Sequence, residues 1–187
     1  MSGDASFPSG LSRLIARQLG REPSIRFEVA TMCVHGWPAV IRNEPLDLRG
    51  EPHPNLFYLT CPWLRRKLAR LEDSGFIATL QQRISESPVL LDDLRRSQSR
   101  HAAEYQSAAE NAGSGSRTRE MFIAGASDPE LLKCLHSHMA YFLVYHDYLV
   151  GQEVALAAGD PWCPDDDERC ASWMNDINAH VTDSGGT

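Results

Sequence analysis

The sequence has no apolar run of the roughly 18 residues that a membrane-spanning helix needs, so we expect no membrane partner. It also lacks an excess of positive charge, since its formal net charge is -7 at pH 7. Non-specific binding to nucleic acid depends on clustered Lys and Arg side chains, so we expect no nucleic-acid partner either. The short basic stretch at residues 65–67 is expected to be the solvated face of a helix.

The N-terminal residues contain no charged segment followed by an apolar run, so we expect no secretory signal and a cytoplasmic location. Cytoplasmic thiols stay reduced. The five cysteines are an odd number, which weakens the case for a disulfide framework. Metal binding, catalysis and simple burial are the remaining roles for these thiols. The sequence identifies no protein partner and no oligomeric state.

The length of 187 residues is typical of one domain. We expect a folded domain over residues 9–160, preceded by a flexible N-terminus at residues 1–8. An acidic tail over residues 161–187 is expected to contain one short helix near Trp173.

The β signal lies in the first third of the chain. Apolar and polar residues alternate over residues 25–31, which predicts a half-buried strand. Gly36 and Pro38 indicate a turn, and residues 39–42 complete a predicted hairpin. A Pro-rich loop over residues 43–55 leads to another predicted strand at residues 56–60.

Helical patterns account for most of the remaining chain. Helices are predicted at residues 9–19, from Pro62 to Gly75, at 76–84 and at 87–109, and a surface loop at 111–119. A strong start signal at residues 127–130 predicts a central apolar helix from Pro129 through Leu149, or as far as Ala158. The predicted fold is therefore a helix-rich α+β domain whose small hairpin or sheet packs on this central helix.

Potential metal ligands are densest at residues 133–138, within the predicted central helix. Cys134, His136 and His138 offer a thiol and two imidazoles within five residues. Residues four apart share a helix face, whereas residues two apart are turned away by about 200°. Helical spacing therefore pairs Cys134 with His138 and directs His136 elsewhere.

Two further thiols follow predicted strands. Cys33 opens the Gly-Pro turn, and Cys61 precedes a helix whose N-terminus would lower the pKa of a thiol. With Cys134 and one histidine they make a set of three cysteines and one histidine, which suits zinc. His35 competes for the fourth place. We expect a zinc site with a structural or regulatory role, whose candidate ligands are Cys33, Cys61, Cys134, His136 and His138.

Three ordered blocks resemble a bacterial family known as domain-of-unknown-function family 501. They are Cys-Val-His-Gly-Trp-Pro-Ala-Val at 33–40, Pro-Asn-Leu-Phe-Tyr-Leu-Thr-Cys-Pro at 54–62 with Leu71, Glu72 and Gly75 after it, and Lys-Cys-Leu-His at 133–136. The resemblance implies that the three thiols and His136 belong to a shared motif, so His136 and His138 both stay open as the histidine ligand. It implies no activity, because the family has none assigned.

Two alternatives to the zinc site remain at this stage. In one, the protein is an enzyme that uses the same thiols to hold an iron–sulfur cluster with an open iron, or that uses a cysteine such as Cys61 as a nucleophile. In the other, it is a metal-free interaction module in which these thiols are merely part of the core. The sequence does not decide whether the protein is an enzyme, and it indicates no substrate.

Overall fold

The structure is a computed structural model that describes residues 9–47, 49–113, 120–164, 167 and 169–183, with the backbone alone for Ser9 and residues 180–183. The described residues form seven α-helices and a small antiparallel sheet. This is the helix-rich α+β fold that the sequence predicts. By its internal contacts the chain separates into two compact units, residues 24–162 and a smaller unit of residues 1–23 with 163–187.

The smaller unit contains two helices, α1 (Ser9–Leu19) and α7 (Arg169–Asp183), which pack on each other. An ion pair joins them, because the Arg17 guanidinium lies 2.9 Å from the Asp176 carboxylate. Helix α1 has the bounds that the sequence predicts. Helix α7 is longer than the short helix expected near Trp173.

The larger unit holds the three-stranded sheet, ordered β1 (Phe27–Met32), β2 (Pro38–Asn43) and β3 (Phe57–Leu59). Both pairings are antiparallel, which confirms the predicted hairpin. In the turn between β1 and β2, Cys33 N–H donates to Trp37 O (2.7 Å), and Gly36 takes a positive φ of 77°. Glycine adopts this left-handed conformation without steric cost.

Three helices follow the sheet, namely α2 (Pro62–Asp73), α3 (Phe76–Glu86) and α4 (Pro88–Asn111). Helices α2 and α4 each begin at a proline, whose missing N–H has no intrahelical partner at that position in any case. Ser87 caps α4 by accepting a hydrogen bond from Leu90 N–H. Gly75, with φ 82°, turns the chain between α2 and α3.

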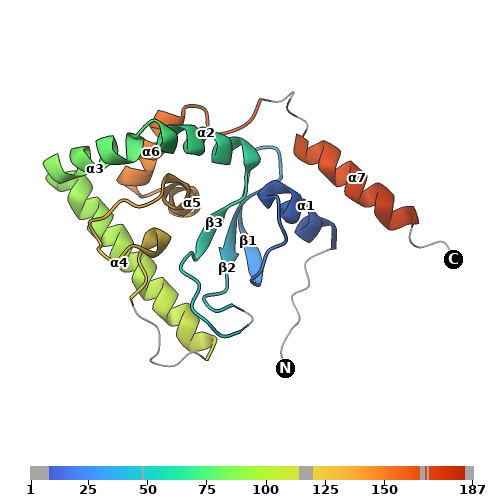
Figure 1. Ribbon diagram of the computed structural model, residues 1–187, viewed down its shortest axis with the longest axis horizontal. Helices are drawn as coiled ribbons and strands as arrows, with labels where there is room; N and C mark the ends of the chain where they lie inside the picture. Colours follow the sequence, from blue (N-terminus) through green and yellow to red (C-terminus); the bar gives the residue numbers. More distant parts are fainter. Residues whose placement is uncertain (1–8, 48, 114–119, 165–166, 168, 184–187) are drawn as a thin grey trace. The chain divides into compact units, whose positions relative to one another are not determined.

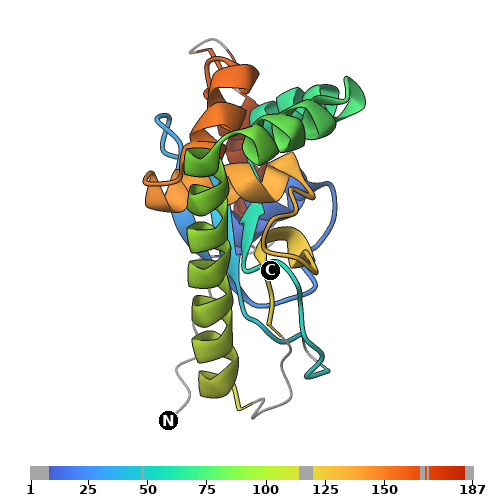
Figure 2. The ribbon, with the colours of Figure 1, turned by 90° about the vertical axis from the view of Figure 1, so that its left-hand side faces the viewer.

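Helix α5 (Leu135–Tyr145) is the centre of the larger unit. Figure 1 shows it end-on beside β3, and it packs on β3, on α2 and on α6 (Leu149–Ala158). Its side chains Leu135, Met139, Ala140 and Tyr141 are buried. Figure 2 shows the long α4 running beside the sheet and α5, with the short 3-10 helix η2 (Ile123–Gly125) nearby.

The close contact between α5 and α6 depends on a glycine. A Cβ atom on Gly151, in the first turn of α6, would lie 2.5 Å from Phe142 Cβ and 2.6 Å from Tyr148 Cδ1. Those separations are far below van der Waals contact, so a larger side chain would force the two helices apart.

The prediction of one helix from Pro129 through Leu149 was wrong. Residues 129–134 are not helical, and α5 begins at Leu135 and ends at Tyr145, followed by His146, whose φ is 58°. Tyr148 is then extended and occupies the N-cap position of α6. Contacts distant in sequence impose both breaks, because side chains of α3 and α4 bind the backbone of residues 130–132 and Asp93 binds the start of α6.

Several sequence predictions fall on residues that the structure does not describe. These are the flexible N-terminus at 1–8, most of the loop at 111–119, and the end of the acidic tail at 184–187. The domain bounds of 9 and 160 also stay a prediction.

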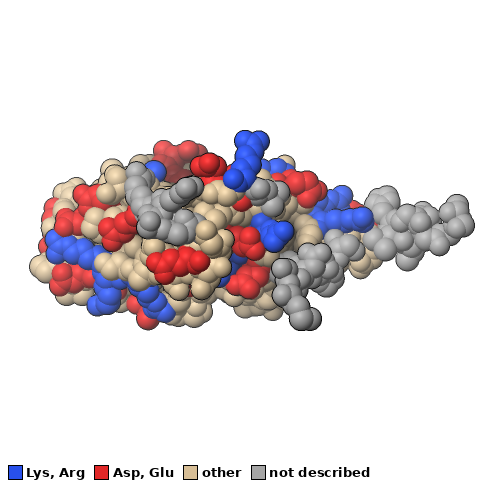
Figure 3. Space-filling model, turned by 90° about the horizontal axis from the view of Figure 1, so that it is seen from below, with Lys and Arg blue, Asp and Glu red and all other residues tan. Residues whose placement is uncertain are grey.

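Charged side chains of both signs are mixed on the face of the molecule drawn in Figure 3. On this face, Lys and Arg side chains are interspersed with Asp and Glu side chains. Among the described helices, none has both the length and the apolar character that a membrane span needs.

Asp93 links α4 to α6, and its replacement tests how much this link stabilises the fold. Its side chain is 1 % exposed, and its two oxygens accept from Arg96 (2.6 Å) and from Val150 N–H (3.1 Å). We expect Asp93→Ala to lower the free energy of unfolding by roughly 2–4 kcal/mol, because it leaves a buried N–H unpaired. Asp92→Ala, whose side chain is 74 % exposed, is the control and should cost roughly 1 kcal/mol or less in urea denaturation.

Two histidines are buried in an aromatic cluster of the larger unit. His138 Nδ1 lies 2.6 Å from the Tyr148 hydroxyl oxygen, and His101 Nδ1–H donates to Met121 O (2.9 Å). Burial disfavours the charged form of both rings. It lowers the pKa of His138 to about 3, with a smaller effect from His101, and it lowers the pKa of His101 as well.

These shifts predict a loss of stability in acid. The unfolded chain binds a proton at each histidine below about pH 6.5, whereas the folded chain keeps His138 neutral, so unfolding takes up protons. His138 alone should reduce the free energy of unfolding by about 2–3 kcal/mol between pH 6.5 and 4.5. Urea denaturation with a metal chelator present measures this change. NMR of the His138 ring is the direct check, and a titration midpoint near 6.5 would contradict the prediction.

Candidate metal site

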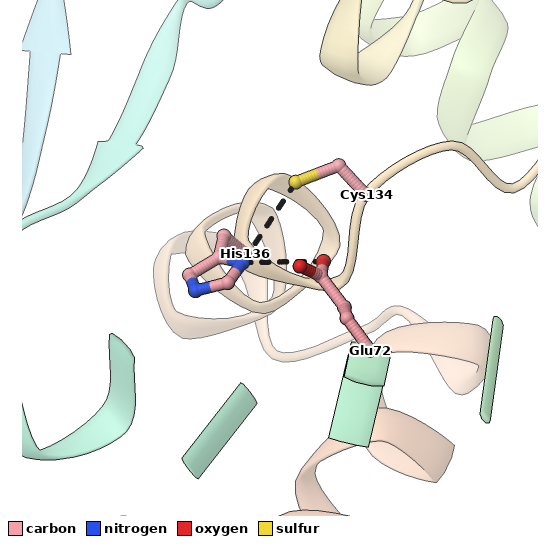
Figure 4. A group of neighbouring side chains, drawn as sticks. All are labelled: Glu72, Cys134 and His136. Carbon is pink, nitrogen blue, oxygen red and sulfur yellow. Dashed lines mark hydrogen bonds and ion pairs between the residues drawn. The ribbon is translucent and has the colours of Figure 1, made fainter. Parts of the chain in front are cut away.

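Three potential metal ligands converge where the last turn of α2 meets the start of α5. Glu72 comes from α2, Cys134 is the N-cap of α5, and His136 lies in its first turn. Figure 4 shows the Cys134 sulfur and the Glu72 carboxylate directed at the same His136 ring nitrogen. His136 Nδ1 is 3.9 Å from Cys134 Sγ and 3.2 Å from Glu72 Oε1. The three ligand atoms all lie within 4.8 Å of one another.

Two glutamines hold the non-helical segment that leads to Cys134. Gln81 of α3 donates to Glu130 O (3.0 Å) and accepts from Leu132 N–H (2.7 Å). Gln98 of α4 donates to Leu131 O (3.4 Å). These amides satisfy backbone groups that would otherwise bond within a helix, so the segment stays non-helical and places Cys134 at the helix start.

Glu72 and His136 are each oriented by the backbone. Glu72 Oε1 accepts from Leu135 N–H (2.7 Å), which also caps α5. His136 Nε2 lies 3.0 Å from Arg65 O. A carbonyl oxygen only accepts hydrogen bonds, so Nε2 carries the proton and the lone pair of the neutral ring is on Nδ1. The nitrogen that faces Cys134 and Glu72 is therefore the one able to bind a metal.

The site is partly open to solvent, since the side chains of His136 and Glu72 are each 26 % exposed. Burial raises the pKa of Cys134, but hydrogen bonds from His136 and from Ser137 N–H outweigh this effect and leave the pKa below its ordinary value. Burial lowers the pKa of His136, but the Cys134 sulfur and the Glu72 carboxylate outweigh it and raise the pKa to about 9. Without a metal the ring is therefore protonated near pH 7, and its Nδ1–H faces Cys134 and Glu72. A metal bound at this point would displace that proton and use the Nδ1 lone pair.

The donor set fits zinc. Thiolate, imidazole and carboxylate are its usual protein ligands, and three of them leave one position of a tetrahedron open. A histidine that binds a metal commonly donates its other ring N–H to a backbone carbonyl, which fixes the tautomer. His136 makes this contact with Arg65 O.

Cys33 and Cys61 lie outside this group. Cys33 is at the β1–β2 turn, where its sulfur accepts from Trp37 N–H (3.4 Å). Cys61 is buried at the N-cap of α2. Eleven residues separate it from Glu72, or about 16 Å along the helix axis. Among the described residues, the structure thus brings together Cys134 and His136 of the predicted ligands, with Glu72 in addition.

His138 is also outside the group. It is fully buried and lies against Tyr148. The helical spacing that favoured His138 over His136 does not apply, because Cys134 precedes the helix and its backbone is extended. The extended residue lets Cys134 and His136, two positions apart, face each other.

Glu72 is the one member of the group that the sequence argument did not propose as a ligand. Its partners Leu135 and His136 lie more than 60 residues away in the chain, so no local spacing indicates it. The available signal was its place in the Leu71–Glu72 part of the family-like blocks.

The chain belongs to the family described as protein of unknown function (DUF501), whose model matches residues 29–156. This confirms the resemblance seen in the sequence blocks, and the match includes Glu72, Cys134 and His136. Comparison with curated proteins found no match, and neither did comparison with solved structures.

The hydrogen bonds of Gln98 predict that replacing this residue lowers the free energy of unfolding. Gln98 is fully buried, and its side chain also accepts from Ile123 N–H (2.7 Å). We expect Gln98→Met to lower the free energy of unfolding by roughly 2–3 kcal/mol, because it leaves buried backbone groups unpaired at similar side-chain volume. Gln106→Met, in the same helix, removes only an exposed hydrogen bond to Glu110 (2.8 Å) among those the structure describes for this half-buried side chain, and should change it by roughly 0.5 kcal/mol or less. Equal effects in urea denaturation would contradict this account.

Proposed function

We propose that this protein binds one zinc ion through Glu72, Cys134 and His136, with the fourth position open to water or to an external ligand. The convergence of three different ligand atoms on one point carries the proposal. The contact of His136 Nε2 with Arg65 O supports it, since this contact turns the free lone pair toward the other two ligands.

The same geometry favours a metal over a cysteine nucleophile. In a cysteine–histidine–acid arrangement, the thiol faces one ring nitrogen and the acid orients the ring through the other. Here the sulfur and the carboxylate both face Nδ1, and Nε2 is engaged by a backbone carbonyl. A metal at the centre uses all three groups at once.

The role that we propose for the ion is to bind water or an external ligand at its open position. Structural zinc sites have four protein ligands, whereas sites with three protein ligands hold a water that the metal activates. A zinc ion here would also join α2 to α5, so its binding would stabilise the fold. A reducing compartment keeps the Cys134 thiol available as a ligand, which fits the expected cytoplasmic location.

The wider ligand set predicted from the sequence, with Cys33, Cys61 and His138, stays a prediction. This wider set would require Cys61, at the start of α2, to lie beside Cys134 and His136, which are at the end of α2. About 16 Å of helix separates those two ends. The iron–sulfur alternative uses the same three thiols and has the same requirement.

Metal analysis of the purified protein tests the proposal. After anaerobic purification and incubation with zinc, we expect about one bound zinc per chain by elemental analysis. Cys134→Ser, His136→Asn and Glu72→Gln should each weaken zinc binding at least about tenfold in competition with a chelator. The fold of each variant is checked by circular dichroism.

Cys33→Ser and Cys61→Ser are the matched controls and should bind zinc as the unmodified protein does. Cobalt substitution gives an independent count of sulfur ligands, because each Co–S bond adds to the near-ultraviolet charge-transfer band. A single thiolate supports the proposed site, and a band several-fold stronger favours three. A protein that takes up no zinc, with an unchanged melting temperature, excludes the proposal.

A further inference from the structure

A groove of about 500 Å³ lies between the two helices of the smaller unit. Its lining residues come from the segment 13–22, which spans the second half of α1 and the turn after it, and from α7. All of them belong to the smaller unit, and none of them belongs to the candidate metal site. The volume is within the range of about 300–1,000 Å³ that is typical of sites for small molecules.

Three arginines line one side of this groove, namely Arg13, Arg17 and Arg21. They are four residues apart, so on a helix they follow one another along one side at intervals of about 6 Å. All three are exposed, and α1 contains no Asp or Glu. This side of the groove is therefore positively charged, although the whole chain has a net charge of -7.

The end of α1 determines where Arg21 lies. Gly20 N–H donates to Arg17 O (3.3 Å), and Arg21 N–H donates to Ala16 O (3.1 Å). These two hydrogen bonds form a Schellman motif, which requires the positive φ of 74° at Gly20. A Cβ atom on Gly20 would meet no atom within 4 Å, so the space beside this turn is open to a ligand.

Arg17 is held in place by α7. Its Nη1 group donates to Asp176 Oδ2 (2.9 Å) and to Trp173 O (3.4 Å). A guanidinium group has five N–H donors, so donors remain on Arg17 for a ligand. Among the described residues, Arg13 forms no hydrogen bond or ion pair, and its guanidinium is available as well.

The floor and the rim of the groove add two features. Ala16 and Ile177 are apolar lining residues, so they offer a surface for the uncharged part of a ligand. Two acids, Glu22 and Asp176, also line the groove. Three arginines against two acids leave a net positive charge, and Asp176 is already paired with Arg17.

The exposure of the arginines limits the kind of anion that can bind. A single exposed ion pair is weak, because water and salt screen it. A ligand must therefore contact several guanidinium groups at once. Phosphoryl oxygens accept pairs of parallel hydrogen bonds from a guanidinium group, and a chain of linked phosphates presents many such oxygens to neighbouring arginines.

We infer that this groove binds a small organic polyphosphate of the nucleoside triphosphate class. Arg13, Arg17 and Arg21 bind the phosphoryl oxygens, and the organic part of the ligand lies against Ala16 and Ile177. The volume of the groove suits a ligand of this size. The site uses no residue of the candidate metal site, so it exists whether or not the chain binds zinc.

Binding of ATP to the full, zinc-free chain tests the inference. We expect two-dimensional ¹H–¹⁵N NMR to show saturable shifts of the backbone amides of Gly20, Arg21 and Ile177. AMP has the same organic part with a single phosphate, so it should bind at least about tenfold more weakly. Adenosine should cause no saturable shift at these amides, because it has no phosphate.

Charge variants separate binding from folding. Arg13→Gln and Arg21→Gln should each weaken ATP binding about fivefold or more and leave the melting temperature unchanged, because both side chains are exposed. Glu22→Gln should tighten ATP binding, because it removes a negative charge from the lining. Arg70→Gln, which changes an exposed arginine of α2, is the matched control and should bind ATP as the unmodified protein does.

Two results would overturn the inference. In the first, ATP causes no saturable shifts at these amides. In the second, the Arg13→Gln and Arg21→Gln variants bind ATP as tightly as the unmodified protein.

Discussion

The hydrogen bond from Leu135 N–H to Glu72 determines how the centre of this fold is arranged. It caps α5 with a carboxylate from α2, and it holds that carboxylate 3.2 Å from His136 Nδ1. A negative charge at a helix N-terminus is favourable because it offsets the positive end of the helix dipole. The same oxygen thus serves both the start of α5 and the candidate metal site.

Side-chain amides and carboxylates play a similar part elsewhere in the larger unit. Gln81, Gln98 and Asp93 bind backbone groups at the ends of extended segments and helices. They divide a region of continuous helical pattern into a non-helical segment and two helices. These contacts link α3 and α4 to the chain on either side of α5, so the position of Cys134 depends on helices far from it in sequence.

Local patterns in the sequence were sufficient for much of the fold. The apolar spacing of α1 and the Gly-Pro turn between β1 and β2 depend on neighbouring residues, and both elements form as predicted. The break before Leu135 could not be predicted in this way, because it depends on Gln81 and Gln98, which are more than 30 residues away. The contact between Glu72 and His136 could not be predicted for the same reason. The sequence was sufficient to propose Cys134 and His136 as ligands, but it did not predict how the two side chains are oriented relative to each other.

Gly151 has a consequence for comparisons within the family. Because α5 and α6 meet where a Cβ atom would overlap Phe142 and Tyr148, a homologue with a larger residue at this position must separate the two helices. That separation would displace Tyr148, the residue whose hydroxyl lies 2.6 Å from His138 Nδ1. The residue at position 151 is therefore a simple marker, readable from sequence alone, of which homologues can share this packing and which have rebuilt it.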